Sequence, residues 1–186
     1  GNPIIAGSSR DSNFSYIPED IKIDNDARYM HITSNNTIFG TQQHWWPEAE
    51  MPLVCDMSSD IFSREFPLEK FGLIYAGAQK NMGAAGTTLV VVRKDMLGHV
   101  TRTLPTMIDY RTHIDNGSMY NTPPVFPIYV SMLVMRWIKK LGGVKKMEEI
   151  NIAKAKLLYD EIDRNPLFRG TTAITDRSLM NVCFVM

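Results

Sequence analysis

Four short, almost continuously apolar runs, separated by turn residues, constrain the fold of this 186-residue chain more than any other feature. The runs are rich in β-branched residues and are bounded by Gly, Asp, Ser or Asn, as buried strands are. Continuous apolarity, in place of alternating apolar and polar residues, is typical of a parallel sheet that is covered on both faces. We therefore expect an α/β fold with a mostly parallel sheet, whose strands lie at residues 28–32, 52–57, 72–77 and 87–92.

The last third of the chain changes to helical periodicity. Apolar residues keep helical spacing over 127–141, Gly142 and Gly143 interrupt the pattern, and a second amphipathic helix continues to Asn165-Pro166. The glycine pair is the best candidate for a boundary, so residues 1–142 are expected to belong to one domain and 143–186 to the start of a smaller α+β domain. Residues 177–186 predict a further strand, and the polar, turn-rich residues 1–27 predict a loop.

Charge and residue counts argue against several classes of protein. Lys and Arg number 20 and Asp and Glu also number 20, which disfavours a nucleic-acid-binding domain. No apolar run reaches the roughly 18 residues of a membrane span. Cys55 and Cys183 are too few for a disulfide scaffold, and neither they nor the histidines show metal-ligand spacing. These counts predict a soluble, cytoplasmic globular protein without a metal site. Because the chain opens on Gly-Asn-Pro and stops in an apolar run, we expect it to be a piece of a longer polypeptide.

The stretch around Lys80 carries the strongest chemical signal. Lys80 directly follows a buried strand and is flanked by small residues, in the sequence Ile74-Tyr-Ala-Gly-Ala-Gln-Lys-Asn-Met-Gly-Ala-Ala-Gly86. A lysine is costly in such a place unless its amine has a function. A secluded amine becomes nucleophilic and can form a Schiff base with a carbonyl compound. The alternative is an ordinary surface lysine in a turn.

Asp56 ends an apolar run of its own, Leu53-Val-Cys-Asp56, where an unpaired carboxylate would be costly. An aspartate in that setting, upstream of a strand-end lysine, is what pyridoxal phosphate requires. The acid holds the pyridine nitrogen protonated, so that the ring can accept electrons from the substrate Cα. A turn or helix N-cap ahead of Ser58-Ser59 is the alternative.

From about Tyr29 to Val182 the chain resembles the phosphoserine aminotransferase family of fold-type-I, class-V pyridoxal-phosphate enzymes. The resemblance is carried by spaced blocks: 31–40 around Asn36-Thr37, 55–64, Tyr75-Ala-Gly-Ala-Gln-Lys-Asn81, Tyr120-Asn-Thr-Pro-Pro124 and Arg177-Ser-Leu-Met-Asn-Val182. It implies an aspartate-aminotransferase-like large domain, of which residues 1–142 are the C-terminal part, and pyridoxal 5′-phosphate as cofactor. It also implies reversible transfer of an amino group from glutamate to 3-phosphohydroxypyruvate, which yields 2-oxoglutarate and phosphoserine in serine biosynthesis.

Carried over by position, the resemblance implies four site residues within one chain. Lys80 binds the cofactor as a Schiff base and moves the proton at the substrate Cα, and Asp56 pairs with the pyridine nitrogen. Thr37 hydrogen-bonds the cofactor's phenolic oxygen, and Gln79 contributes to the phosphate cup. Thr37 could instead close a loop, and Gln79 could cap a strand end.

Asn121 and Thr122 are implied to reach across a homodimer interface to the partner subunit's cofactor phosphate, although the composition of 121–124 alone predicts a turn. The groups that would bind the substrate's phosphate and carboxylate lie outside the chain. Two rival functions therefore stay open. One is a related pyridoxal enzyme, either a serine–glyoxylate-type aminotransferase or a cysteine desulfurase, for which Cys55 beside Asp56 is badly placed. The other is a non-catalytic α/β module.

Overall fold

The computed structural model describes residues 2–186 and is centred on a four-stranded sheet in the order β1-β4-β5-β6. Its strands are β1 (Met30–Thr33), β4 (Leu53–Asp56), β5 (Phe71–Gly77) and β6 (Thr88–Val92). β1, β4 and β5 are parallel, whereas β6 runs antiparallel to β5. The mostly parallel α/β sheet expected from the apolar runs is confirmed, with each strand within two residues of its expected start.

The two faces of the sheet differ in burial. One face carries the main core, in which Leu53, Cys55, Ile74 and Ala76 are buried with apolar side chains of the following loops. On the opposite face Val54 and Tyr75 are half-buried and His31 is exposed. The expected cover on both faces is therefore present on one face only among residues 2–186.

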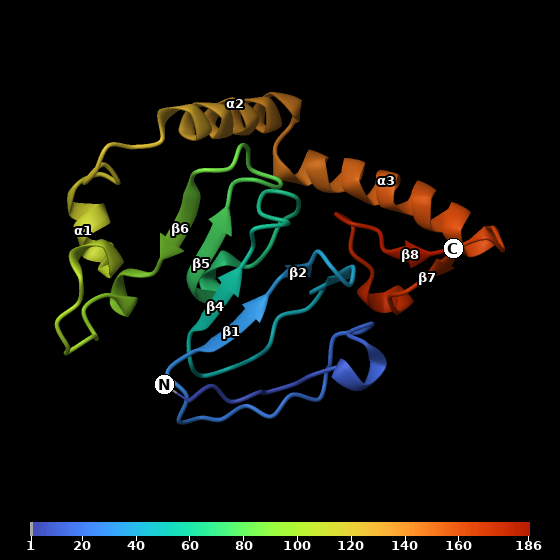
Figure 1. Cartoon of the computed structure of the whole chain (residues 1–186), viewed down its shortest axis with the longest axis horizontal. Helices are drawn as coiled ribbons and strands as arrows, with labels where there is room; N and C mark the ends of the chain where they lie inside the picture. Colours follow the sequence, from blue (N-terminus) through green and yellow to red (C-terminus); the bar gives the residue numbers. More distant parts are fainter. Residues whose placement is uncertain (1) are drawn as a thin grey trace.

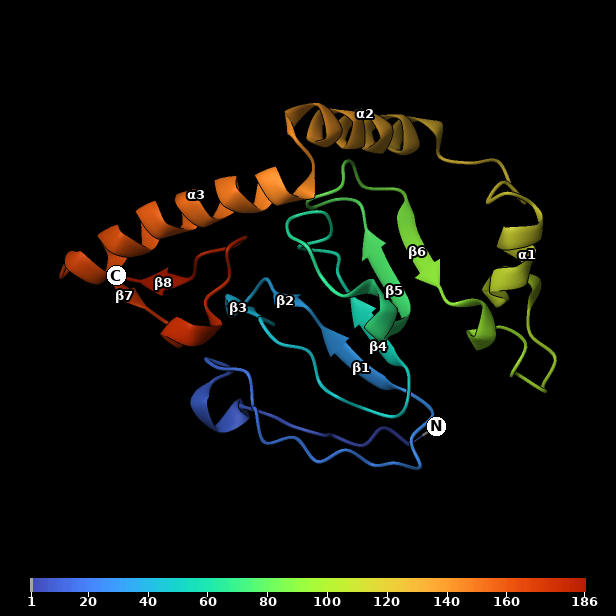
Figure 2. The ribbon, with the colours of Figure 1, turned by 180° about the vertical axis from the view of Figure 1, so that it is seen from behind.

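Three helices follow the sheet: α1 (Tyr110–Asp115), α2 (Val125–Leu141) and α3 (Val144–Arg164). The two long helices confirm the expected pair. Gly142 and Gly143 have φ values of 120° and 84°, which allow the chain to turn between them. In Figures 1 and 2, α2 and α3 lie on the side toward which the arrowheads of β1, β4 and β5 point. α2 also packs on the loop after Lys80, because a Cβ at Gly83 would lie 2.7 Å from Ser131 Oγ.

The C-terminal unit packs along α3 and has a small core of its own. β7 (Arg169–Gly170) and β8 (Phe184–Val185) form an antiparallel pair, and Tyr159 and Ile162 of α3 pack against Phe168 and Leu179. The strand expected over 177–186 is wrong in extent, since only β8 is a strand. The physical reason is that side chains take the backbone hydrogen bonds here: Leu179 N donates to Gln42 Oε1, and Met180 N donates to Ser178 Oγ.

The remaining elements are short. β2 (Asn35–Asn36) and β3 (Thr41–Gln42) form a hairpin directly after β1, and residues 2–29 are irregular apart from the 3₁₀ turn at Arg10–Ser12, as expected. Further 3₁₀ turns occupy Leu68–Lys70, Lys94–Met96, Thr106–Ile108 and Ile174–Asp176. Within residues 2–186, no helix has the length and apolarity that crossing a bilayer requires, and no group of three or more His, Cys, Asp or Glu side chains could hold a metal ion.

Candidate active site

The candidate site lies at the carboxyl edge of the parallel strands. Asp56 is the last residue of β4, Lys80 follows the end of β5, and Thr37 lies in the β2–β3 hairpin that continues β1. Because the three strands are parallel, their carboxyl ends meet at one edge of the sheet. The Lys80 Nζ atom donates a hydrogen bond to Thr37 Oγ1 at 2.5 Å, although the two residues are 43 positions apart. The fold thus joins two of the residues singled out from the sequence.

Asp56 is half-buried at this edge, and its carboxylate is partly used by the local turn. Ser58 N donates to Asp56 Oδ1 at 2.8 Å, which is the turn interaction considered as the alternative for this residue. Asp56 aligns with Thr33 of β1 and Tyr75 of β5 in the sheet register, so its side chain lies on the open face. A carboxylate at this position can hold a protonated ring nitrogen that approaches from the open face.

Tyr75 and His31 are neighbours of Asp56 that the sequence reasoning left without a role. The Tyr75 hydroxyl lies 3.0 Å from His31 Nε2. Burial, followed by the charge of Asp56 and a hydrogen bond to it, raises the pKa of Tyr75. His31, Asp56 and Tyr75 share the face opposite the core, so the register of the strands is the feature that brings them together. Metal-ligand spacing, the only pattern examined for the histidines, does not reveal a group whose members come from three different strands.

Gln79 is exposed and its side chain folds back over the end of β5. A Cβ at Gly77 would lie 2.6 Å from Gln79 Oε1, so the amide lies close to the Gly77 backbone. Gly77 N donates to Ser58 Oγ at 3.0 Å, which makes Ser58 a further polar group at this edge that the sequence reasoning did not single out. Amide and hydroxyl groups of this kind suit an anionic phosphate, and the donor set therefore fits pyridoxal phosphate.

Asn121 and Thr122 are exposed in the connection between α1 and α2. In Figure 1 this connection lies at the β6 end of the sheet, away from β1. Asn121 Nδ2 donates to the carbonyl of Thr122 at 3.3 Å, a local contact typical of a turn. Within residues 2–186, the hydrogen bonds described for these two residues do not connect them to Lys80 or Asp56.

A buried polar cluster lies directly beneath the site. The Asp60 carboxylate accepts hydrogen bonds from Ser34 Oγ, from Gln42 Nε2 at 3.3 Å and from Arg64 Nη2 at 3.2 Å. Ser34 is adjacent to the site, because its backbone N–H donates to the Asp56 carbonyl at 3.0 Å. The cluster thus links the core of the sheet to the strand end that carries Asp56.

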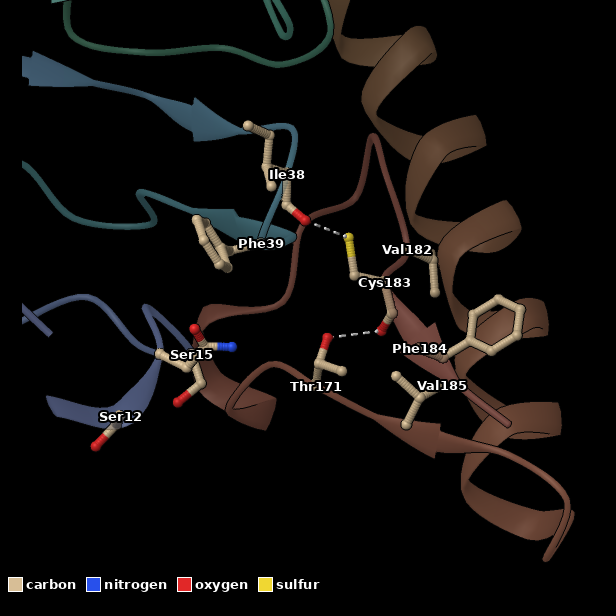
Figure 3. A pocket seen from close by; sticks show the side chains of 10 residues that line it. Ser12, Ser15, Ile38, Phe39, Thr171, Val182, Cys183, Phe184 and Val185 are labelled. Atoms are coloured by element: carbon tan, nitrogen blue, oxygen red, sulfur yellow. Dashed lines mark hydrogen bonds between the residues drawn. The ribbon is translucent and has the colours of Figure 1, made fainter. Parts of the chain in front are cut away.

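A cavity lies beside the hairpin rather than at Lys80. It has a volume of about 430 Å³ and is lined by the hairpin residues Ile38 and Phe39, by the N-terminal turn and by the C-terminal unit (Figure 3). Cys183 Sγ points to the Ile38 carbonyl, 3.4 Å away, at its rim. We place the candidate site at Lys80 because the reactive groups converge there; the cavity wall lacks an amine and a carboxylate.

The mostly parallel sheet presents a lysine, a hydroxyl and a carboxylate at its carboxyl edge, and the structures that the chain matches show an α/β domain of the fold-type-I aminotransferase kind. The chain belongs to the class-V aminotransferase family, whose model matches residues 11–186. Members of this family use pyridoxal phosphate. The sequence is 60% identical over all 186 residues to the phosphoserine aminotransferase of Flavobacterium johnsoniae, of which it covers 52%.

Two solved structures extend this similarity. The phosphoserine aminotransferase from Bacillus circulans subsp. alkalophilus is 45% identical and superposes with a TM-score of 0.95, over 99% of this chain and 52% of that one. The pyridoxal-phosphate-bound phosphoserine aminotransferase from Trichomonas vaginalis is 40% identical with a TM-score of 0.89, over 97% of this chain and 53% of that one. The chain therefore spans about half the length of the relatives that it matches.

Proposed function

We propose that these 186 residues supply the lysine-bearing part of a phosphoserine:2-oxoglutarate aminotransferase of serine biosynthesis. The observation that carries the proposal is the Lys80 amine, hydrogen-bonded to the Thr37 hydroxyl at the sheet edge where Asp56 ends β4. The 60% identity with the Flavobacterium johnsoniae phosphoserine aminotransferase supports the substrate class. On this proposal, the amino group of phosphoserine is transferred reversibly to 2-oxoglutarate, which yields 3-phosphohydroxypyruvate and glutamate.

Bound pyridoxal phosphate would supply a carbonyl and an electron-accepting ring that stabilises negative charge at the substrate Cα. Lys80 would bind that carbonyl and, once released, would move the proton at Cα. Asp56 would hold the proton on the ring nitrogen, since its carboxylate faces the open side of the sheet. Thr37 would orient the amine and donate to the phenolic oxygen, and Gln79 would add an amide to the phosphate cup.

We also propose that the active assembly is a homodimer in which Asn121 and Thr122 contact the partner subunit's cofactor phosphate. Two observations support a covered surface on that side: the α1–α2 connection is exposed, and so are several large apolar side chains of α2, among them Val125, Phe126 and Trp137. Apolar side chains gathered in this way are typical of an interface. The division at residues 142 and 143 into a large and a small domain, and a cytoplasmic location, stay predictions of the same proposal.

The rival functions differ in what they require of the chain. A cysteine desulfurase needs a mobile, nucleophilic thiol. Cys55 is fully buried in β4, and burial raises the pKa of its thiol to about 12, so the neutral and unreactive form persists at physiological pH. A serine–glyoxylate-type aminotransferase would use the same Lys80 and Asp56, and substrate assays separate it from our proposal.

The direct test uses the complete gene product, meaning the full polypeptide in which these residues occur. With pyridoxal phosphate, phosphoserine and 2-oxoglutarate, we expect glutamate to form, and we expect Lys80→Ala to abolish its formation. Lys94→Ala, which removes an exposed lysine from a 3₁₀ turn, is the matched control and should keep full activity. Turnover by Lys80→Ala, or faster turnover of serine with glyoxylate than of phosphoserine, would overturn the proposal.

A further inference from the structure

We propose that Asn181 is a positioning residue, whose side-chain amide fixes the hairpin turn at Asn36 and Thr37 and so keeps the Thr37 hydroxyl at the Lys80 amine. The inference rests on the proposed function, because that proposal gives Thr37 and Lys80 their roles. It adds a residue of the C-terminal unit to a site whose other members all precede α2 along the chain.

The contact between Asn181 and the hairpin is direct. Asn181 Nδ2 lies 2.9 Å from the Thr37 carbonyl and 3.3 Å from the Asn36 carbonyl, so one amide group serves two consecutive backbone acceptors. The residues are 144 positions apart in the chain. The irregular segment between the 3₁₀ turn Ile174–Asp176 and β8 thus has a polar contact with the turn that carries the Thr37 hydroxyl.

Asn181 is itself held from the other side. Its Oδ1 atom accepts a hydrogen bond from Asn35 Nδ2 at 2.7 Å and lies 3.2 Å from Ser178 Oγ. Asn35 and Ser178 are both buried, at 2% and 0% exposed. The side chain must accept on one atom and donate from the other, which an amide does and a carboxylate or an alkyl group cannot. This double requirement distinguishes Asn181 from a general packing residue.

Without Asn181 the turn stays closed internally but loses the amide contact to its Asn36 and Thr37 carbonyls. Asn36 Oδ1 accepts from Ile38 N at 3.0 Å and from the following backbone N–H at 3.2 Å, so the turn is closed internally. Its other polar contacts with that unit come from Cys183 Sγ, a weak donor that Figure 3 shows at Ile38, from Thr172 Oγ1 at the Phe39 carbonyl, and from Ser178 N at the Gly40 carbonyl. A displacement of about 1 Å at a positioning group is enough to weaken catalysis severely.

The test follows the visible absorption of the bound cofactor against pH in the complete gene product. A hydroxyl that donates to the phenolic oxygen stabilises its negative charge and lowers the pH midpoint of this titration. Asn181→Ala should therefore raise the midpoint by about one to two units, which corresponds to the loss of one hydrogen bond to a charged group. Thr37→Val should give a similar rise, and adding Asn181→Ala to Thr37→Val should give no further shift.

Two more variants separate positioning from folding. Asn181→Asp keeps the acceptor for Asn35 and Ser178 but loses the donor, so it should shift the midpoint as Asn181→Ala does while staying folded by circular dichroism. Asn165→Ala, which removes an amide hydrogen bond to Glu161 in the same unit, should leave the midpoint unchanged. Unshifted midpoints in both Asn181 variants, or a full additional shift in the Thr37→Val background, would overturn the inference. A parent protein without lysine-bound cofactor would instead overturn the proposed function.

Discussion

Removal of the Asp60 carboxylate should destabilise the protein more than any exposed acidic substitution. Asp60 and Arg64 form an ion pair at 3.2 Å in which the two side chains are only 3% and 11% exposed. Truncation to alanine leaves the Arg64 guanidinium buried without its partner and Gln42 without an acceptor. Breaking a buried pair from one side costs about 3–5 kcal/mol, a large part of the roughly 5–15 kcal/mol that stabilises a typical protein.

The assay is urea unfolding of the complete gene product, followed by circular dichroism and checked by thermal unfolding. At about 2–4 °C per kcal/mol for a domain of 150–250 residues, Asp60→Ala should lower the Tm by roughly 6–20 °C. The matched control is Asp160→Ala. Asp160 also pairs with a cation four positions away, Lys156, but both side chains are exposed, and such a pair contributes at most about 0.5 kcal/mol.

A paired substitution checks the physical reason. If the cost comes from an uncompensated buried charge, Asp60→Leu combined with Arg64→Met should recover much of the lost stability. An Asp60→Ala variant that loses no more than about 1 kcal/mol, which is the mean cost of any substitution, or that unfolds within error of Asp160→Ala, would refute the reasoning.

Three further predictions concern the site and its surroundings. Asp56→Asn should reduce transamination at least a hundredfold while much of the cofactor binding survives, because the ring loses its proton-holding acid; kcat and cofactor titration measure this, and normal rates would place the acid elsewhere. Asn121→Ala should weaken cofactor binding in the homodimer. In mixed dimers with Lys80→Ala, the defect should appear in the site opposite the mutated chain, and a defect confined to its own site would contradict the cross-subunit role. Cys55 should resist alkylation in the native protein at pH 8. Because its folded pKa of about 12 exceeds the unfolded value of 9.0, stability should fall between those pH values by roughly 1.4 kcal/mol per unit, and Cys55→Ala should remove that slope.

The sheet and the lysine were predictable from local sequence patterns. A buried strand can be recognised from its own apolar residues and the turn residues at its ends, without knowledge of its tertiary contacts. β4 and β5 could therefore be located to within about a residue. Lys80 was singled out because a charged residue directly after a buried strand was expected to be secluded; the expectation of seclusion is wrong, since Lys80 is exposed among residues 2–186. Its partner Thr37 was expected only from the family resemblance, since the two lie 43 positions apart.

Tertiary side-chain contacts were not predictable in this way. Ser178 and Asn181 are residues that occur in turns as readily as in buried networks, and only the packing of the C-terminal unit makes them partners of the hairpin. The same contacts explain why residues before β8 are irregular where apolarity predicted a strand. The exposure of the sheet face around Tyr75 could not be predicted either. A run of apolar residues predicts that a strand is buried, but it does not show which segment covers each face.

The central claim is that the Lys80 amine binds pyridoxal phosphate. Borohydride reduction of the complete gene product loaded with the cofactor, followed by proteolysis and mass spectrometry, tests it most directly. The proposed site predicts a pyridoxyl group fixed on Lys80, lost in Lys80→Ala and retained in Lys94→Ala. Stable cofactor binding with the label on another lysine, or with no lysine labelled, would contradict it.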